Sequence, residues 1–187
     1  AKLQELKGNM LASLDIPGEH INADFSQWTV GGDDQTRARV AKIINFAKHY
    51  AANYRKGHAN ILLTGNTGTG KTKLACLIAN EIVRQRYYAQ MTVAFKSSAQ
   101  IQQETKATWG YASTDTDAAY LERLSRSTVL IIDDAGIGDT GYSDKSSDKD
   151  RERLSVVLNR RYELRLPTII TTNMTEKEFY DHMGDRA

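Results

Sequence analysis

The sequence predicts an α/β fold in which a parallel sheet is sandwiched by helices. Four short runs rich in β-branched residues, at 60–64, 91–95, 128–132 and 168–172, alternate with longer helical patterns. Val-Leu-Ile-Ile and Thr-Ile-Ile-Thr in the last two runs are continuous rather than alternating, which is typical of strands buried on both faces. A chain of 187 residues is long enough for one such domain and too short for two of ordinary size.

The helices are predicted from apolar residues that recur at helical spacing. Residues 33–56 form an amphipathic helix, with Asp33 or Asp34 as its cap and Gly57 as its stop. Further helical patterns lie at 71–87, 97–109, 116–126 and 148–165. Residues 1–30 are expected to be a lead-in, a short helix followed by an extended segment, so that the domain proper covers 31–187. The charged stretch 139–153 is predicted to be a solvated loop.

Composition and charge exclude several classes of protein. Hydrophobic residues make up 40% and charged residues 26%, which is ordinary for a soluble globular protein. No apolar run is long enough to cross a bilayer and no signal-peptide pattern opens the chain, so we expect no membrane partner. The single cysteine, Cys76, excludes an internal disulfide, fits a reducing cytoplasm and is expected in the core. A net charge of +2 does not by itself indicate nucleic-acid binding.

A phosphate-binding motif follows the first predicted strand. Residues 65–72 fit G-x-x-x-x-G-K-[ST] at every fixed position, between a predicted strand and a predicted helix. The glycines let backbone N–H groups point inward, and the helix N-terminus adds its positive end. Lys71 is expected to contact the β- and γ-phosphates, and the Thr72 hydroxyl to coordinate Mg²⁺. We therefore predict a site for ATP or ADP with Mg²⁺, formed by Gly65, Asn66, Thr67, Gly68, Thr69, Gly70, Lys71 and Thr72.

Two carboxylates, Asp133 and Asp134, end the third apolar run. Such a strand delivers acidic side chains to the carboxyl edge of a parallel sheet. We predict that Asp133 holds Mg²⁺, directly or through water, and that Asp134 activates the attacking water. The alternative is that Asp-Asp-Ala-Gly only makes a turn, but the phosphate-binding motif favours the catalytic interpretation. No histidine has metal-ligand spacing, so no other metal is expected.

The fourth apolar run ends at Asn173, whose amide can hold the γ-phosphate or the attacking water because it both donates and accepts. The alternative is that Asn173 caps the next helix. Thr175, three residues before Glu178, is equally suited to that cap, which would leave Asn173 free for chemistry.

With these motifs in order, residues 25–187 resemble P-loop NTPases of the AAA+ (ASCE) type, and in particular the DnaC and DnaI helicase loaders. IstB transposition helpers are related to these loaders, and DnaA initiators more distantly. The resemblance rests on 65–72 as Walker A, 129–134 as Walker B, Arg161-Tyr162 with 167–173 as the sensor 1 region, and Met-Gly-Asp-Arg at 183–186.

This resemblance implies a sheet in the order 5-1-4-3-2 and a sensor 1 role for Asn173. It implies that Arg186 is a finger offered to the ATP of a neighbouring subunit, and hence self-assembly. Asp134 departs from the pattern, since many AAA+ proteins carry Glu there. The resemblance also implies a fifth strand and a helical lid beyond residue 187 and a helicase-binding domain before Ala1, so the chain is expected to be trimmed.

The function implied by the resemblance is an ATPase that places a replicative helicase on single-stranded DNA during DNA replication. In the loaders, the region that corresponds to Lys96, Lys106, Trp109 and Tyr111 resembles an insertion that meets single-stranded DNA, although Trp109 is equally consistent with packing. Two alternatives stay open: an IstB-like helper that recruits a transposase, and a nucleotide-gated scaffold with little hydrolysis. Arg160 and Arg161 suit either a subunit interface or a solvated helix face.

Overall fold

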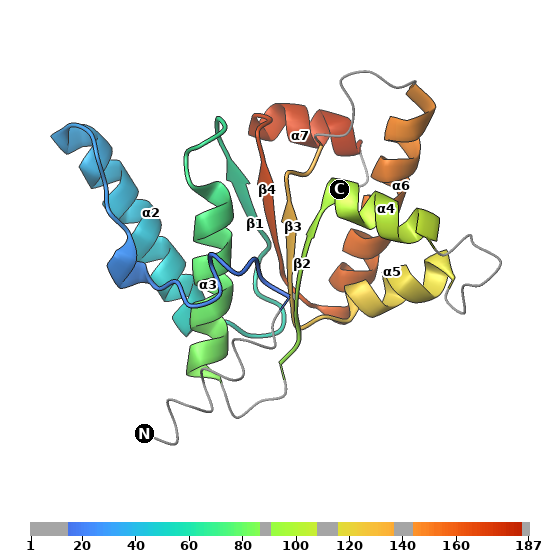
Figure 1. Cartoon of the computed structure of the whole chain (residues 1–187), viewed down its shortest axis with the longest axis horizontal. Helices are drawn as coiled ribbons and strands as arrows, with labels where there is room; N and C mark the ends of the chain where they lie inside the picture. The colour runs from blue at the N-terminus through green and yellow to red at the C-terminus, as the bar shows by residue number, and fades with distance from the viewer. Residues whose placement is uncertain (1–14, 87–90, 108–115, 137–143, 185–187) are drawn as a thin grey trace.

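The computed structural model of the protein describes residues 15–86, 91–107, 116–136 and 144–184. Four strands form one sheet in the order β1-β4-β3-β2, and every neighbouring pair is parallel (Figure 1). The strands are β1 (Ile61–Thr64), β2 (Val93–Ser97), β3 (Val129–Asp133) and β4 (Thr168–Thr172). This result confirms the predicted order for the strands that fall on the described residues.

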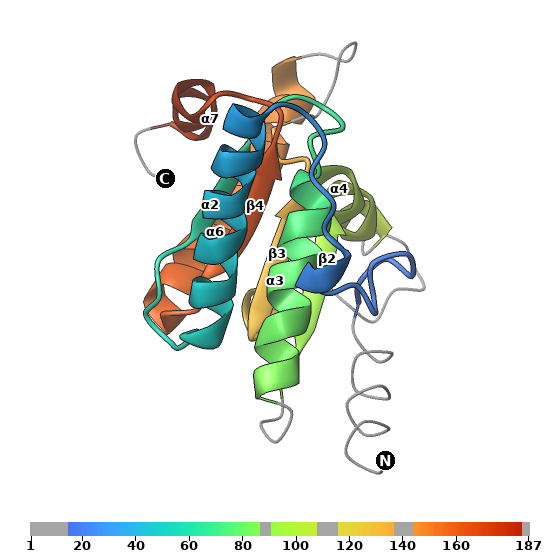
Figure 2. The same ribbon diagram turned by 90° about the vertical axis from the view of Figure 1, so that its left-hand side faces the viewer.

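Helices cover both faces of the sheet. They are the short 3-10 helix η1 (Phe25–Gln27) and the α-helices α2 (Asp34–Ala52), α3 (Lys71–Gln85), α4 (Ser98–Ala107), α5 (Asp117–Ser125), α6 (Asp144–Leu164) and α7 (Glu176–Met183). Helices α2 and α3 lie on one face, as Figure 2 shows, and α4 to α7 lie on the other. None of the described helices combines the length and the apolar character that crossing a bilayer requires.

The two faces bury alternate residues of the central strand β3. Val129 and Ile131 belong to the core beneath α2 and α3, whereas Leu130 and Ile132 belong to the core beneath α4 to α7. Because both sets are buried, the run reads as continuously apolar, as predicted. Cys76 of α3 is fully buried in the first core, which confirms its predicted place, and burial raises the pKa of its thiol to about 12.

Most element ends lie within two residues of the predictions, and the largest differences are at the end of α2 and the start of α6. Helix α2 begins after Asp33, whose carboxylate accepts the Thr36 N–H at 2.7 Å, but it ends at Ala52, well before Gly57. There the Asn53 amide donates to the carbonyl of His49 at 2.9 Å and closes the last turn. Helix α6 begins at Asp144, so the loop predicted over 139–153 was wrong for residues 144–153, and residues 139–143 lie outside the described ranges. A segment of mixed charge can be a solvated helix as readily as a loop.

The described part of the lead-in is folded against α3 rather than extended. Ile16, Ala23 and Phe25 are buried in the core beneath α2 and α3. The buried amide of Asn80 on α3 donates to the carbonyls of His20 at 2.7 Å and Ala23 at 3.0 Å, which fixes the lead-in along the helix. The predicted helix before residue 15 lies outside the described residues.

The buried guanidinium of Arg161 closes the amino end of the sheet. It is 1% exposed and donates to the hydroxyl of Thr168 at 2.9 Å and to the carbonyls of Ser125 at 2.9 Å, Ser127 at 2.6 Å and Pro167 at 2.7 Å. Burial lowers the pKa of Arg161 to about 10, so the group stays charged at neutral pH. Both sequence interpretations, a subunit interface and a solvated helix face, were wrong for Arg161. Side-chain direction on a helix of mixed character cannot be read from spacing alone.

We expect Arg161→Met to lower the free energy of unfolding by about 1–3 kcal/mol, because it leaves the carbonyls of Ser125, Ser127 and Pro167 without this donor. Arg160→Met is the matched control. Arg160 is 36% exposed and pairs with Glu122 and Glu163, so its loss should cost less than about 1 kcal/mol. Urea denaturation of both variants measures the difference, and equal losses would contradict the role assigned to Arg161.

Candidate active site

The loop between β1 and α3 has the geometry of an anion-binding loop. Gly65 and Gly70 have φ angles of 143° and 87°, which residues with a side chain rarely adopt, so the two fixed glycines of the motif are required. Helix α3 begins at Lys71, and no side chain caps its first turn. No side chain therefore competes with a ligand for the first N–H groups of this helix.

The ammonium group of Lys71 connects this loop to the end of β4. It donates to the carbonyls of Gly65 at 2.8 Å and Asn66 at 3.0 Å, and to the side-chain oxygen of Asn173 at 2.6 Å. Lys71 and Asn173, which are 102 residues apart in the sequence, therefore meet in one place. This contact brings together two residues that the sequence assigned to the same site.

Asn173 is not the cap of the helix that follows it. Helix α7 is capped by Thr175, whose hydroxyl accepts the Glu178 N–H at 3.3 Å, while the Glu178 carboxylate accepts the Thr175 N–H at 2.8 Å. This capping box satisfies the helix start without Asn173. The amide of Asn173 is thus available to face the phosphate-binding loop.

Asp133 stands at the end of β3 and is only 8% exposed. Its Oδ1 atom accepts hydrogen bonds from the hydroxyls of Thr72 at 2.9 Å and Thr171 at 2.7 Å. A hydroxyl and a carboxylate in contact are hard oxygen ligands that fit Mg²⁺, which proteins typically hold by one or two oxygens together with substrate phosphates. The described residues contain no cluster of three or more His, Cys, Asp or Glu able to hold a metal alone. Thr72 and Asp133 therefore suit an ion that arrives with a nucleotide.

Asp134 has an unusual backbone. Its φ of 51° lies in the left-handed region, which Asp tolerates better than most residues. Its N–H donates to the Thr171 hydroxyl at 3.0 Å, and its side chain is exposed. Desolvation by nearby protein and the charge of Asp133 raise the pKa of Asp134, whereas the ammonium of Lys71 opposes this shift. An exposed carboxylate beside the lysine can accept a proton from water.

A groove of about 650 Å³ opens beside the phosphate-binding loop, between α2, β1 and the start of α3. Its lining is largely apolar and includes Trp28, Val40, Ile43 and Leu63. The Trp28 ring packs so closely on the loop that a Cβ atom at Gly70 would lie 3.0 Å from it. An apolar slot beside an anion-binding loop has the chemistry to take a nucleobase. Sequence reasoning missed Trp28, because nothing in the lead-in signals contact with a loop some forty residues later.

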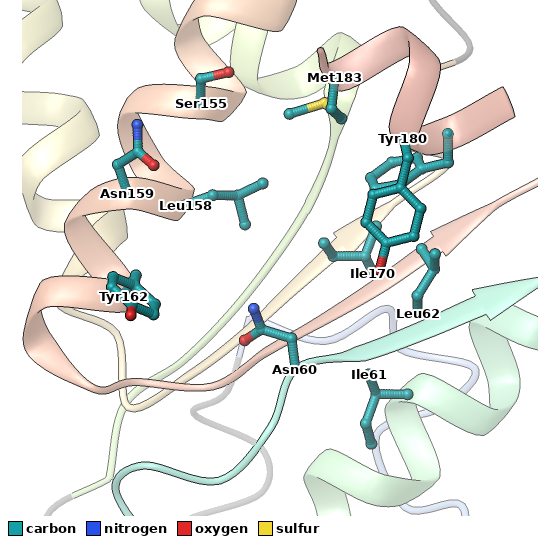
Figure 3. A pocket seen from close by; sticks show the side chains of 11 residues that line it. Asn60, Ile61, Leu62, Ser155, Leu158, Asn159, Tyr162, Ile170, Tyr180 and Met183 are labelled. Carbon is teal, nitrogen blue, oxygen red and sulfur yellow. The ribbon is translucent and has the colours of Figure 1, made fainter. Parts of the chain in front are cut away.

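A second cavity, of about 560 Å³, lies between α6, α7 and β1 (Figure 3). Tyr162 and Asn159 come from α6, Tyr180 and Met183 from α7, and Leu62 from β1. It contains none of the residues that the sequence assigned to nucleotide or metal binding, although Ile61 and Leu62 of β1 line both this cavity and the groove.

Comparison with known proteins agrees with this geometry. The family described as IstB-like ATP binding protein matches residues 29–187. The chain belongs to this IstB-like family. The replicative helicase loader DnaC of Escherichia coli K12 is 27% identical over 169 residues, which are 90% of this chain and 62% of that protein. The phage-like element PBSX protein XkdC of Bacillus subtilis is 29% identical over 174 residues, 89% of this chain and 59% of XkdC. The chain thus spans about three fifths of these relatives.

Solved structures with the same fold include a DnaC helicase loader, with a TM-score of 0.69 and 21% identity over 90% of this chain and 91% of that one. DnaI gives 0.64 at 24% identity, covering 91% and 82% of the two chains. AMPPCP-bound DnaA from Aquifex aeolicus gives 0.66 at 18% identity, covering 91% and 47%. The fold of this IstB-like chain is therefore that of the AAA+ P-loop proteins, as the sequence predicted.

The remaining predicted site residues of the IstB-like chain are the candidates for DNA contact and the arginine finger. Lys96 is 19% exposed and forms ion pairs with Asp15 at 3.2 Å and Glu104 at 2.9 Å, which is a structural use of its charge. Lys106 is exposed at the end of α4. Trp109, Tyr111 and Arg186 lie outside the described residues. Helix α7 ends at Met183 with Gly184 as its cap at φ 75°, as predicted.

Proposed function

We propose that this domain binds Mg-ATP at residues 65–72 and hydrolyses it. One observation carries the proposal. At the carboxyl ends of the strands, where Asp134 also lies, Lys71 is hydrogen-bonded to Asn173 and Thr72 is hydrogen-bonded to Asp133. Anion-binding backbone, a cation, hard oxygen ligands and a proton acceptor are the parts that phosphoryl transfer to water requires. Membership of the IstB-like ATP-binding family supports the same conclusion.

Each side chain has one role in this proposal. Mg²⁺ bound by Thr72 and Asp133 would neutralise charge on the phosphates. When the nucleotide binds, the Lys71 ammonium would leave the carbonyls of Gly65 and Asn66 and donate to oxygens of the β- and γ-phosphates. Asp134 orients a water molecule and accepts its proton, while the Asn173 amide holds the γ-phosphate or that water.

We expect Lys71→Ala to abolish nucleotide binding and leave the fold intact, since Lys71 is only partly buried and its bonds lie within the site. Titration with a fluorescent ATP analogue measures the affinity, and circular dichroism checks the fold. Lys48→Ala removes the same charge from an exposed position of α2 and is the control. An affinity for Lys71→Ala within about twofold of the parent would refute the assignment of the loop.

Asp134→Asn should keep Mg-ATP binding and lose turnover, because the amide has the shape of the carboxylate but cannot accept the proton. Phosphate release is measured with and without single-stranded DNA. Hydrolysis at the parental rate would show that the activating acid lies elsewhere. A parent that binds ATP but never hydrolyses it would instead favour the nucleotide-gated scaffold.

Arg186 is proposed as a finger that acts on the ATP of a neighbouring copy. Helix α7 ends at Met183, and its cap Gly184 lies two residues before Arg186, which supports a turn of the chain at this point. Such fingers contribute roughly 10³ to 10⁵ in rate. In a chain extended to include the lid, Arg186→Ala and Lys71→Ala proteins should each be inactive alone and regain partial ATPase when mixed. Co-assembly of the two without any recovery would count against a finger acting between subunits.

The wider role we propose is the loading of a replicative helicase on single-stranded DNA. Relatives named replicative helicase loader DnaC support it, and the exposed Lys106 at the end of α4 supports DNA contact. The IstB-like family name keeps a transposition helper as the second candidate. A pull-down with the full-length protein, offered a replicative helicase and a transposase in parallel, distinguishes these roles. Capture of the transposase alone would reject the loader.

A further inference from the structure

We propose that Thr171 is a positioning residue for both carboxylates of the ATPase site, an inference that rests on the proposed function. Its hydroxyl donates to Asp133 Oδ1 at 2.7 Å and accepts the Asp134 N–H at 3.0 Å. The side chain of Thr171 is fully buried, with 0% exposure. One hydroxyl group therefore contacts the carboxylate of the proposed Mg²⁺ ligand, Asp133, and the main chain of the residue that carries the proposed proton acceptor, Asp134.

The direction of these two hydrogen bonds is fixed by their partners. A threonine hydroxyl carries one proton and two lone pairs. The Asp134 N–H can only donate, so it occupies a lone pair, and the single proton is left for the Asp133 carboxylate, which only accepts when ionised. The hydroxyl cannot rotate without breaking one bond or the other. It therefore fixes the carboxylate of Asp133 relative to the main chain of Asp134.

The place of Thr171 in the sheet reinforces this arrangement. Strand β4 pairs with β3 so that Thr168 faces Leu130 and Ile170 faces Ile132, which brings Thr171 beside Asp133. The main-chain carbonyl of Thr171 accepts the N–H of Ala135 at 2.8 Å. Thr171 thus bonds the main chain at two successive residues: its hydroxyl accepts the N–H of Asp134, and its carbonyl accepts the N–H of Ala135. These two bonds anchor the left-handed turn at Asp134 to β4, and the adjacent Thr172 adds a bond to the carbonyl of Ala135.

Asp133 Oδ1 is held from two elements. Thr72 approaches from the first turn of α3 and Thr171 from β4, and both hydroxyls end on the same oxygen. Two donors on one oxygen restrict rotation of the carboxylate, which is how partners behind a metal ligand raise its affinity for the ion. The neighbouring Thr172 differs, because its buried hydroxyl donates at 2.6 Å to a main-chain carbonyl, that of Ala135. Thr172 is therefore a matched control for loss of a buried hydroxyl.

The experiment compares the 187-residue chain with Thr171→Val, Thr171→Ala, Thr171→Ser and Thr172→Val. For each protein, a fluorescent non-hydrolysable ATP analogue is titrated in Mg²⁺ and in EDTA, and the melting temperature is recorded. The quantity of interest is the gain in affinity that Mg²⁺ produces. We expect Thr171→Val to reduce this gain by about tenfold or more, as loss of a residue supporting a metal ligand typically does, with its affinity in EDTA almost unchanged. Thr171→Ser and Thr172→Val should keep the gain, although Thr172→Val lowers the melting temperature.

Each other outcome overturns the inference. An undiminished gain in Thr171→Val, or an equal reduction in Thr172→Val, would reduce Thr171 to a packing residue. If Thr171→Val does not fold, Thr171→Ala and Thr171→Ser differ by the hydroxyl alone, and equal gains for that pair would refute the role. A parent chain whose affinity for the analogue does not rise with Mg²⁺ contradicts the proposed function itself. Only in that case do the proposed function and the role of Thr171 fail together.

Discussion

Parallel pairing of β4 between β1 and β3 is the constraint on which the site depends. In a parallel sheet all carboxyl ends lie at one edge, so the residues that follow β1, β3 and β4 must meet there. The loop after β1 supplies Lys71 and Thr72, and β3 supplies Asp133. Among the strands of the described residues, only β4 pairs with both β1 and β3. Its end supplies Thr171 and Asn173, which form hydrogen bonds to Asp133 and Lys71 respectively.

The opposite edge of the sheet is built for stability rather than binding. There the guanidinium of Arg161 satisfies three carbonyls and one hydroxyl in a dry environment. A buried charge is expensive unless its hydrogen bonds are complete, and these are supplied largely by the main chain. The sheet therefore has a closed amino edge and an open carboxyl edge.

Much of this arrangement could be predicted from the sequence, because local patterns determine it. The phosphate-binding motif predicts a loop together with the strand before it and the helix after it. The order of the strands was predicted from the family resemblance, which rests in part on this motif. Trp28 and Thr171 could not be placed in this way, since their partners lie far away in the sequence. The inward direction of the Arg161 side chain could not be read from helical spacing, although two of its partners, Pro167 and Thr168, lie close by in the chain. Thr171 gave a weak signal as a polar residue within an apolar run, but only the register of β3 and β4 identifies what its hydroxyl meets. The start of α6 was missed because a mixed-charge segment has no apolar stripe.

The contact between Lys71 and Asn173 has a consequence for the order in which the protein is made. These residues are separated by 102 positions, and β4 is the last of the described strands to be synthesised. A nascent chain that ends before β4 contains the entire phosphate-binding motif, yet it lacks the strand that separates β1 from β3. Long-range parallel pairings form late because their loop closure is costly. The site described above is therefore completed by β4, and a chain interrupted before this strand during translation carries the motif without the assembled site.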